Sequence, residues 1–460
     1  LKIADSENIE LARQLIRCHA YWRMKGLVVD LVIWNEEHVG YRQRLQDQII
    51  GLIATGPEAH AVDRPGGIFV RYVEQISNED RILLQAAARV IISEGRGSLV
   101  EQANRRVLAD KSVARMSPTR AHRPEPPAPP DPSRPDLVLG NHFGGFTADG
   151  TEYVISTAQA QMTPLPWVNV LANPVLGTVL SESGVSYTWH ENAHEFRLTP
   201  WSGDPVGATG GEAIYLRDEE SGHVWSPTPF PAGGAMPYRT RHGFGYSVFE
   251  HTSGGIHSEL RVYVDPVDPV KFSVLKVRNG SGRMRRLSAT GFVEWVLGSL
   301  RARSAQHVVT EIDAASGALF ARNAYNSEFS GRVAFFDVDD LSRTLTGDRA
   351  EFLGRNGTMA RPDALTRSRL SGRLGAALDP CGAIQVPFDL ADGEEREIIF
   401  RLGAGRSIEQ ARTLAKRLRI PGSARSSLAN VRQYWSRALG TVQVATPDPA
   451  INVMANGWLL

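Results

Sequence analysis

The sequence contains one arrangement of residues that is typical of zinc chemistry, because His190, Glu191 and His194 spell H-E-x-x-H. On a helix, histidines at this spacing share a face and bind one Zn²⁺, while the glutamate activates a metal-bound water. The surrounding stretch, YTWHENAHEFRLTPW at 187–201, is instead rich in residues that favour strands. Residues four apart on a strand lie about 13 Å from each other, too far to share one ion. Glu212, a candidate third ligand, follows a glycine-containing loop, so we expect no metal site here.

Other patterns that carry chemistry are weaker. The stretches GRGS (95–98) and HGFGYS (242–247) lack the strand–G-x-G-x-x-G–helix arrangement that binds dinucleotides. Asp337, Asp339 and Asp340 offer carboxylates of the kind that bind Ca²⁺, but DVDD is also typical of a solvated turn, which we expect. These stretches therefore predict no cofactor.

Aromatic and planar polar side chains are concentrated between residues 141 and 251. Sugars present apolar C–H faces beside hydroxyl groups, so their binding sites combine aromatic rings with planar hydrogen-bonding groups. The same aromatic residues would also fill the core of a sandwich. The composition thus favours a β-rich domain with a carbohydrate-binding surface, without separating contact residues from core residues. The set comprises Trp167, Trp189, Trp201, Trp225, Tyr187, Tyr215, Tyr238, Tyr246, Asn169, Asn173, Arg197, Asp204, Arg241 and His242.

The bulk composition is that of a globular chain of two or three domains. The 460 residues carry 51 Lys and Arg against 50 Asp and Glu, so no strong attraction to nucleic acid or to an anionic membrane is expected. Cys18 and Cys381 are too few for a disulfide framework, and we expect two reduced thiols. No apolar run is long enough to cross a bilayer. Because the chain begins at Leu1 and stops at MANGWLL inside an apolar helical pattern, we expect it to be a piece of a longer polypeptide.

Residues 1–115 alternate between helical and strand patterns, which is typical of a small α/β sheet. Helical periodicity covers 6–24, 41–53, 78–93 and 98–108, and apolar runs at 26–36 and 67–74 indicate buried strands. Residues 116–136 hold eight of the 27 prolines and few large apolar groups, which predicts an extended linker.

From 137 to 403 the pattern changes to short strands separated by polar turns. This predicts a mainly β fold, a large antiparallel sandwich without helices between its strands. Hairpins are predicted at 213–229, 238–265, 270–298, 307–325 and 383–403. Helical periodicity returns at 407–418 and 427–439, which indicates a helical linker over 404–446, and a further helix is expected to begin within 447–460.

Several blocks in a fixed order resemble glycoside hydrolase family 94. They are NHFGGFTADGTEYVI (141–155), TPLPWVNVLANPVLG (163–177), SESGVSYTW (181–189), RLTPWSGDPV (197–206), GEAIYLRDEESGHVWSPTP (211–229), YRTRHGFGYSVFEH (238–251), FVEWVLG (292–298) and ARNAYNSEF (321–329). This series is most similar to the N-terminal β-domain of the family as it occurs in cyclic β-1,2-glucan synthases. Cellobiose and chitobiose phosphorylases belong to the same family. The segment before the proline-rich stretch also resembles the region that precedes this domain in the glucan synthases, so the resemblance covers nearly the whole chain.

The resemblance implies a galactose-mutarotase-like super-sandwich, a helical linker, and at 447–460 the start of an (α/α)6 barrel. It also implies inverting phosphorolysis, in which phosphate attacks the anomeric carbon while a carboxylic acid protonates the departing oxygen. That acid belongs to the barrel, so no catalytic residue is assigned in this chain. Inorganic phosphate is the implied co-substrate of the parent enzyme, and no other cofactor is expected.

The same resemblance implies a β-glucan as partner and no nucleic acid. It implies a homodimer formed through the β-domain, and a parent protein in the bacterial inner membrane whose anchoring parts lie outside this chain. These residues would then face the cytoplasm. The alternative is a stand-alone carbohydrate-binding module without catalysis, and a zinc peptidase is the weakest reading.

For sugar contacts we single out Arg197, Trp201, Arg241, His242 and Glu294. One departure from the family pattern lies beside them, because His194 and Phe196 stand where the family usually has an Arg and an Asn. If these two positions touch sugar, recognition in this protein differs from that of its relatives.

Overall fold

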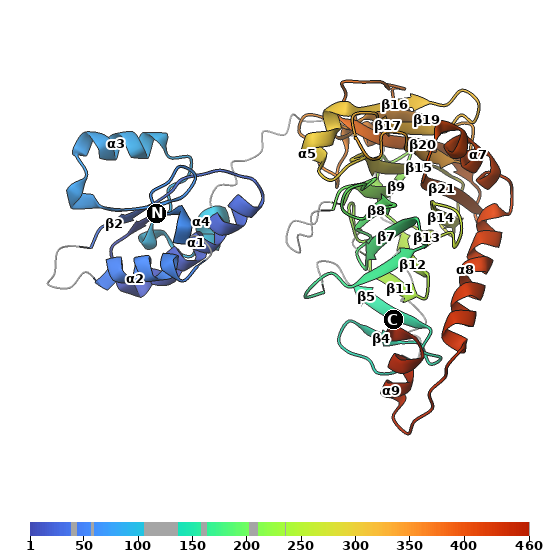
Figure 1. The fold of residues 1–460 in the computed structure, drawn as a ribbon, viewed down its shortest axis with the longest axis horizontal. Coiled ribbons are helices and arrows are strands. Elements are labelled where there is room, and N and C mark those ends of the chain that lie inside the picture. The colour runs from blue at the N-terminus through green and yellow to red at the C-terminus, as the bar shows by residue number, and fades with distance from the viewer. Residues whose placement is uncertain are drawn as a thin grey trace. The chain divides into compact units, whose positions relative to one another are not determined.

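The computed structural model describes residues 1–37, 44–56, 59–104, 137–157, 163–201, 210–234 and 236–459. The chain forms two compact units, Leu1–Ser117 and Pro118–Leu460, and each has a hydrophobic core made of its own residues (Figure 1). The predicted linker at 116–136 lies outside the described residues, so the domain boundaries stay a prediction.

The first unit is a small parallel sheet with helices packed on it. Its elements are β1 (Lys2–Ile3), α1 (Ile9–Met24), β2 (Leu31–Asn35), α2 (Arg44–Ala54), β3 (Ile68–Tyr72), α3 (Asn78–Ala87) and α4 (Leu99–Asn104), with strand order β1-β2-β3. The helix predicted over 78–93 is too long. Ser93 forms a parallel bridge with Lys2, whose N–H donates to the Ile92 carbonyl at 2.8 Å, so the residues after Ala87 leave the helix to extend the sheet.

The second unit is a sandwich of two antiparallel sheets that face each other across the main core. Among the described residues, the larger sheet has the order β16 (Val308–Ile312), β17 (Leu319–Asn323), β18 (Val333–Val338), β21 (Glu395–Gly405), β14 (Val270–Asn279), β13 (Ile256–Val264), β12 (Tyr246–Ser253), β11 (Tyr238–Gly243), β5 (Glu152–Thr157) and β4 (Gly144–Phe146). The smaller sheet has the order β10 (Val224–Trp225), β9 (Glu212–Asp218), β15 (Arg285–Glu294), β20 (Pro380–Leu390) and β19 (Thr344–Asp348). The predicted absence of helices between the strands is wrong, because α5 (Arg301–Ser304) and α6 (Arg349–Leu353) are short helices there.

Two of the predicted hairpins, 270–298 and 383–403, are also wrong. The strands β14 and β15 belong to different sheets, as do β20 and β21, so each turn carries the chain from one sheet to the other. The two corners meet at Asn279, whose Nδ2 donates to the Leu390 carbonyl at 2.9 Å and whose carbonyl accepts from the Gly393 N–H at 2.8 Å. A turn sequence thus marks where a strand ends without showing which strand it pairs with.

A third sheet, β6 (Val168–Ala172), β7 (Leu176–Ser181) and β8 (Ser186–His190), packs on the sandwich through its inward-facing leucines. On the outer face of the larger sheet lie α7 (Ile408–Leu418) and α8 (Ser423–Gly440). Figure 1 shows α8 running beside the strands and leading to α9 (Pro449–Val453) near β4. There, Trp458 packs against Phe146 and donates its indole N–H to the Gly150 carbonyl at 2.7 Å.

Candidate functional site: an aromatic face on β8

The two faces of strand β8 carry different chemistry. Its inward residues are buried, and they alternate with the half-buried Tyr187 and Trp189. Trp189 stands opposite Gly177 of β7, where an added Cβ would lie 2.2 Å from the indole ring. The glycine therefore leaves the space that the Trp189 ring occupies, and the ring lies over the neighbouring strand.

Four side chains, Tyr187, Trp189, Arg197 and Trp201, come together on the outward side, and we call this set the aromatic face. The Tyr187 ring centroid lies 5.3 Å from that of Trp189 and 4.9 Å from that of Trp201. The Arg197 guanidinium lies 5.9 Å from the Tyr187 centroid, and its Nε donates to the Ala193 carbonyl at 3.2 Å. All four side chains are half-buried, so each keeps a surface that water reaches. The set combines apolar rings with a planar donor, which is the chemistry that binds sugar rings and their hydroxyls.

Neighbouring strands extend the aromatic face with aliphatic side chains. Val170 of β6 and Val179 of β7 stand in register with Tyr187, so all three share one side of the sheet. Val168 and Val170 are 47% and 54% exposed. The apolar surface is therefore wider than the three rings alone.

On its inward side, β8 is held by a buried ion pair. The Nζ of Lys271 on β14 lies 2.6 Å from an oxygen of Glu212 on β9, and both side chains are buried. Thr188 and Thr199 donate to the other Glu212 oxygen at 2.6 and 2.7 Å. Ser186 donates to the Lys271-bound oxygen at 3.1 Å. Because these residues come from all three sheets of the second unit, the network fixes β8 to both layers of the sandwich.

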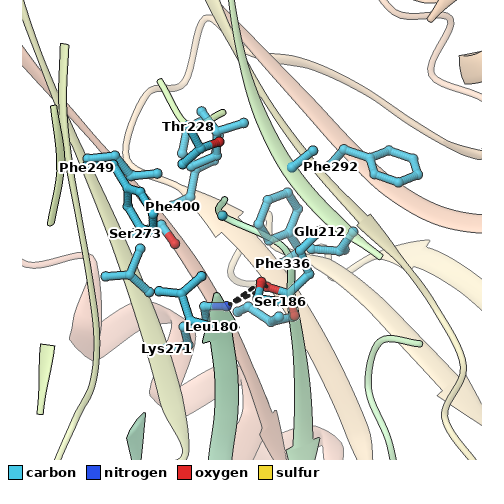
Figure 2. Close-up of a pocket in the computed structure, with 17 residues that line it drawn as sticks. Leu180, Ser186, Glu212, Thr228, Phe249, Lys271, Ser273, Phe292, Phe336 and Phe400 are labelled. Atoms are coloured by element: carbon cyan, nitrogen blue, oxygen red, sulfur yellow. Dashed lines mark hydrogen bonds and ion pairs between the residues drawn. The ribbon is translucent and has the colours of Figure 1, made fainter. Parts of the chain in front are cut away.

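Figure 2 shows the Lys271–Glu212 pair beside an internal cavity whose other walls include Phe249, Phe336 and Phe400. The cavity measures about 50 Å³, which is enough for water but far below the about 300 Å³ at which small-molecule sites begin. Burial alone would raise the pKa of Glu212, but Lys271 and the threonine hydroxyls outweigh burial and lower it. The pair is therefore charged and satisfied, which suits an anchor rather than a proton donor.

Comparison with known proteins places this geometry in a family. A model of Glycosyl hydrolase 94, supersandwich domain, matches residues 151–421. The chain belongs to this family. The super-sandwich fold and the family resemblance predicted from the sequence are thus confirmed.

The relatives of this family 94 chain are carbohydrate-active enzymes. It is 32% identical over its whole length to the cyclic beta-(1,2)-glucan synthase NdvB of Rhizobium meliloti, and spans 16% of that protein. It is 26% identical over 69% of its length to the N,N'-diacetylchitobiose phosphorylase of Vibrio proteolyticus, and spans 40% of it. It is 29% identical over 69% of its length to the solabiose phosphorylase of Paenibacillus borealis, and spans 42% of it. The chain thus spans less than half the length of each of these relatives.

The residues of the H-E-x-x-H pattern are not brought together in the family 94 fold. His190 is the last residue of β8 and is fully buried, whereas His194 lies exposed in the next turn and contacts Glu195 at 2.6 Å. Glu191 pairs with Arg332 at 2.8 Å, and Glu212 is occupied by Lys271. Within the described ranges, no group of three His, Cys, Asp or Glu side chains is arranged to hold a metal ion.

Of the five predicted sugar contacts, Arg197 and Trp201 lie in the aromatic face, and the structure does not bring the other three to it. Arg241 lies on the outer face of the larger sheet, 3.0 Å from Glu152 and 3.5 Å from Glu250. His242 points the opposite way on β11, and its Nδ1 lies 2.8 Å from the Ser247 hydroxyl. Burial lowers the pKa of His242 to about 4.

Glu294, the third of these residues, is an internal ion-pair partner. It is buried at the end of β15 and pairs with Arg301 and, at 2.8 Å, with Arg349. The departure from the family pattern at Phe196 also lies in the core, where the ring stacks on Phe329 at 4.9 Å. Phe196 therefore packs against protein in this structure.

Most of the remaining aromatic and polar candidates are structural. Tyr215, Trp225 and Tyr238 are buried, and Asp204 lies outside the described residues. Asn169 and Asn173 donate to backbone carbonyls of the larger sheet and its turns. Tyr187 and Trp189 were in the predicted aromatic set but not among the five contacts. The sequence feature that could have identified them is the alternation of polar and aromatic residues in SYTWH, which places both rings on one face of the strand. In the structure, a glycine of the neighbouring strand lies opposite Trp189.

Two smaller predictions have opposite outcomes. The predicted solvated turn at Asp337, Asp339 and Asp340 is wrong for Asp337, which is fully buried between Arg343 at 2.8 Å and Arg419 at 2.6 Å, whereas Asp339 and Asp340 follow the strand and are half-buried. Cys18 and Cys381 are both free thiols, as predicted. In the part of the chain that the structure describes, no helix is both long and apolar enough to cross a membrane.

Proposed function

We propose that this chain is the glucan-binding and scaffolding part of a cyclic β-1,2-glucan synthase-like enzyme. The observation that carries the proposal is that a chain related over its whole length to a glucan synthase presents an aromatic face on β8. The parent reaction is inverting phosphorolysis or glycosyl transfer on β-glucans, with inorganic phosphate as co-substrate. The buried carboxylates Glu212 and Glu294 are paired with cations, which supports proton donation from a barrel outside these residues.

Three finer features of the proposal rest on the family resemblance alone. The β-domain forms a homodimer, the parent is a protein of the bacterial inner membrane, and these residues face the cytoplasm.

The test compares this chain with a longer protein that includes the downstream region. Both should bind β-1,2-glucan in calorimetry, and Trp201→Ala should weaken binding about fivefold, since one stacked ring contributes about 1 kcal/mol. The control is Tyr434→Ala, which removes a 58% exposed ring on α8 and should leave the affinity unchanged.

Phosphate-dependent release of glucose-1-phosphate separates the roles of the two proteins. We expect release only from the longer protein. Release by this chain alone would contradict the assignment of the chemistry to the barrel. Failure of both proteins to bind β-1,2-glucan would overturn the proposed function, and a parent gene that stops at Leu460 would favour the stand-alone module instead.

A further inference from the structure

A second concave surface borders the aromatic face. Glu195, Ser299 and the segment 325–329 line a groove of about 270 Å³, and nearly all of its lining is polar. Arg197 and Gly298 exchange backbone hydrogen bonds of 3.1 and 3.4 Å. Glu195 and Ser299, which line the groove, lie within two residues of this junction. The groove and the aromatic face therefore share the segment that follows β8 as a common border.

Tyr325 is one of the residues that line the groove, and its aromatic ring is held beside the polar lining in a fixed orientation. The side chain is 77% exposed, yet one ring face stacks on His307 with centroids 4.1 Å apart and planes 13° apart. The Tyr325 N–H donates to the Asn323 side chain at 3.1 Å, and Asn323 in turn donates to the Leu297 carbonyl at 3.0 Å. An aromatic ring that is held in place loses little entropy on binding, and its free face is suited to the C–H face of a sugar.

The polar lining selects for a neutral, hydroxyl-rich ligand. Asn326 accepts from the N–H groups of Glu328 and Phe329 at 3.1 and 3.0 Å, which fixes the turn. Among the described residues, the amide donors of Asn326 have no hydrogen-bond partner. The carboxylates of Glu195 and Glu328 accept hydrogen bonds from hydroxyl groups but repel phosphate and carboxylate groups. Of the described residues that line the groove, none carries a cationic side chain, so an anionic sugar is disfavoured.

We infer that this groove binds one neutral glucosyl residue of a glucan chain whose neighbouring residues lie on the aromatic face. The volume is close to the about 300 Å³ lower limit of small-molecule sites, so the groove accommodates one ring and the rest of the chain continues across the shared border. The inference rests on the proposed function and deepens it, because the combined surface recognises a chain of several residues rather than a disaccharide.

The test measures Kd for linear β-1,2-glucooligosaccharides of increasing length, with wild type, Tyr325→Ala, Trp201→Ala and the control Tyr434→Ala. The affinity of the wild type should rise with oligosaccharide length until the sugar chain is long enough to extend from the aromatic face into the groove. Tyr325→Ala should bind the disaccharide like wild type but lose about tenfold for the long chains, whereas Trp201→Ala should weaken binding at every length. Because Tyr325 is exposed, its replacement should leave the unfolding transition unchanged.

The outcomes separate this inference from the proposed function. If wild type binds glucan with an affinity independent of length, or Tyr325→Ala equals wild type for long chains, the groove site is refuted while the proposed function stands. If wild type binds no β-1,2-glucan of any length, the proposed function fails and the inference fails with it.

Discussion

At the scale of single residues, His190 shows why a short motif is ambiguous in this chain. Its ring is fully buried, and neither ring nitrogen has a hydrogen-bond partner among the described residues. Burial lowers the pKa of His190 to about 4, and Glu191 only partly opposes this. The imidazole is therefore neutral and acts as a core side chain, at the expense of an unsatisfied polar group.

Replacing His190 by Leu should reduce the pH dependence of stability, and the part that remains is assigned to the buried His242 and His251, whose pKa values burial also lowers to about 4. An unfolded histidine binds a proton below its ordinary pKa of about 6.5, whereas folded His190 stays neutral down to about 4. Between these values the unfolded state binds more protons, so the free energy of unfolding falls as the pH drops. At pH 5 this contribution is about 2 kcal/mol, obtained as 1.36 kcal/mol for each pH unit below 6.5. Urea unfolding at pH 7 and pH 5 measures it.

The control for this experiment is His60→Gln, because His60 is an exposed histidine of the first unit and its replacement should leave the unfolding of the second unit unchanged at both pH values. If His190→Leu lost as much stability between pH 7 and pH 5 as wild type does, the buried neutral imidazole would be excluded as a source of acid sensitivity.

Residue type alone did not show which of the five predicted contact residues lie together in the structure. Arg241 and His242 are adjacent in sequence and were both predicted to contact sugar, but neighbouring residues on a strand point to opposite faces, so at most one could. Arg197 and Trp201 lie together in the aromatic face, because both follow a strand whose alternation is visible in the sequence, and their contact with sugar stays a prediction. Glu294 could not be recognised as an ion-pair partner, since Arg349 lies on a distant element.

At the scale of elements, β8 couples the candidate site to the interior. Its outward residues form the aromatic face, and its inward residues bind the Lys271–Glu212 pair. The strand character of 186–190 was predictable from local composition, as was the large antiparallel sandwich. The sheet to which each strand belongs was not, because β14 and β15 are joined by hairpin-like turn residues and still separate at the Asn279 corner. Such pairings depend on contacts between residues far apart in sequence.

Lys271→Met should lower the free energy of unfolding by about 3–5 kcal/mol, because it leaves the Glu212 charge buried without its partner. Lys276→Met is the control on the same strand. Its pair with Glu395 is similarly short, at 2.8 Å against 2.6 Å, but both side chains are 44% exposed, so the change should stay below about 1 kcal/mol. Adding Glu212→Leu to Lys271→Met should recover part of the loss. Equal effects of the two lysine substitutions in urea unfolding would show that the buried pair does not anchor β8.

At the scale of the whole molecule, the chain joins two units with unrelated architectures. The core of Leu1–Ser117 is built from residues of α1, α2 and the parallel sheet, and the cores of Pro118–Leu460 contain only residues of the sandwich and its helices. The phosphorylase relatives match 69% of the chain, whereas the glucan synthase matches all of it. The α/β unit is thus a feature shared with the glucan synthase, while the aromatic face and the groove lie in the second unit.

A protein consisting of Pro118–Leu460 should therefore fold alone and bind β-1,2-glucan with the same Kd as the full chain. Each core contains residues of one unit only, so calorimetry of the full chain should show a second unfolding transition that the shorter protein lacks. The shared transition should occur at the same temperature in both proteins and move upward when glucan is added, because a ligand that binds only the folded state stabilises it. The transition specific to the full chain should not move. A glucan-dependent shift of that transition would mean that the α/β unit takes part in binding, and the assignment of the site to β8 and the groove would then be incomplete.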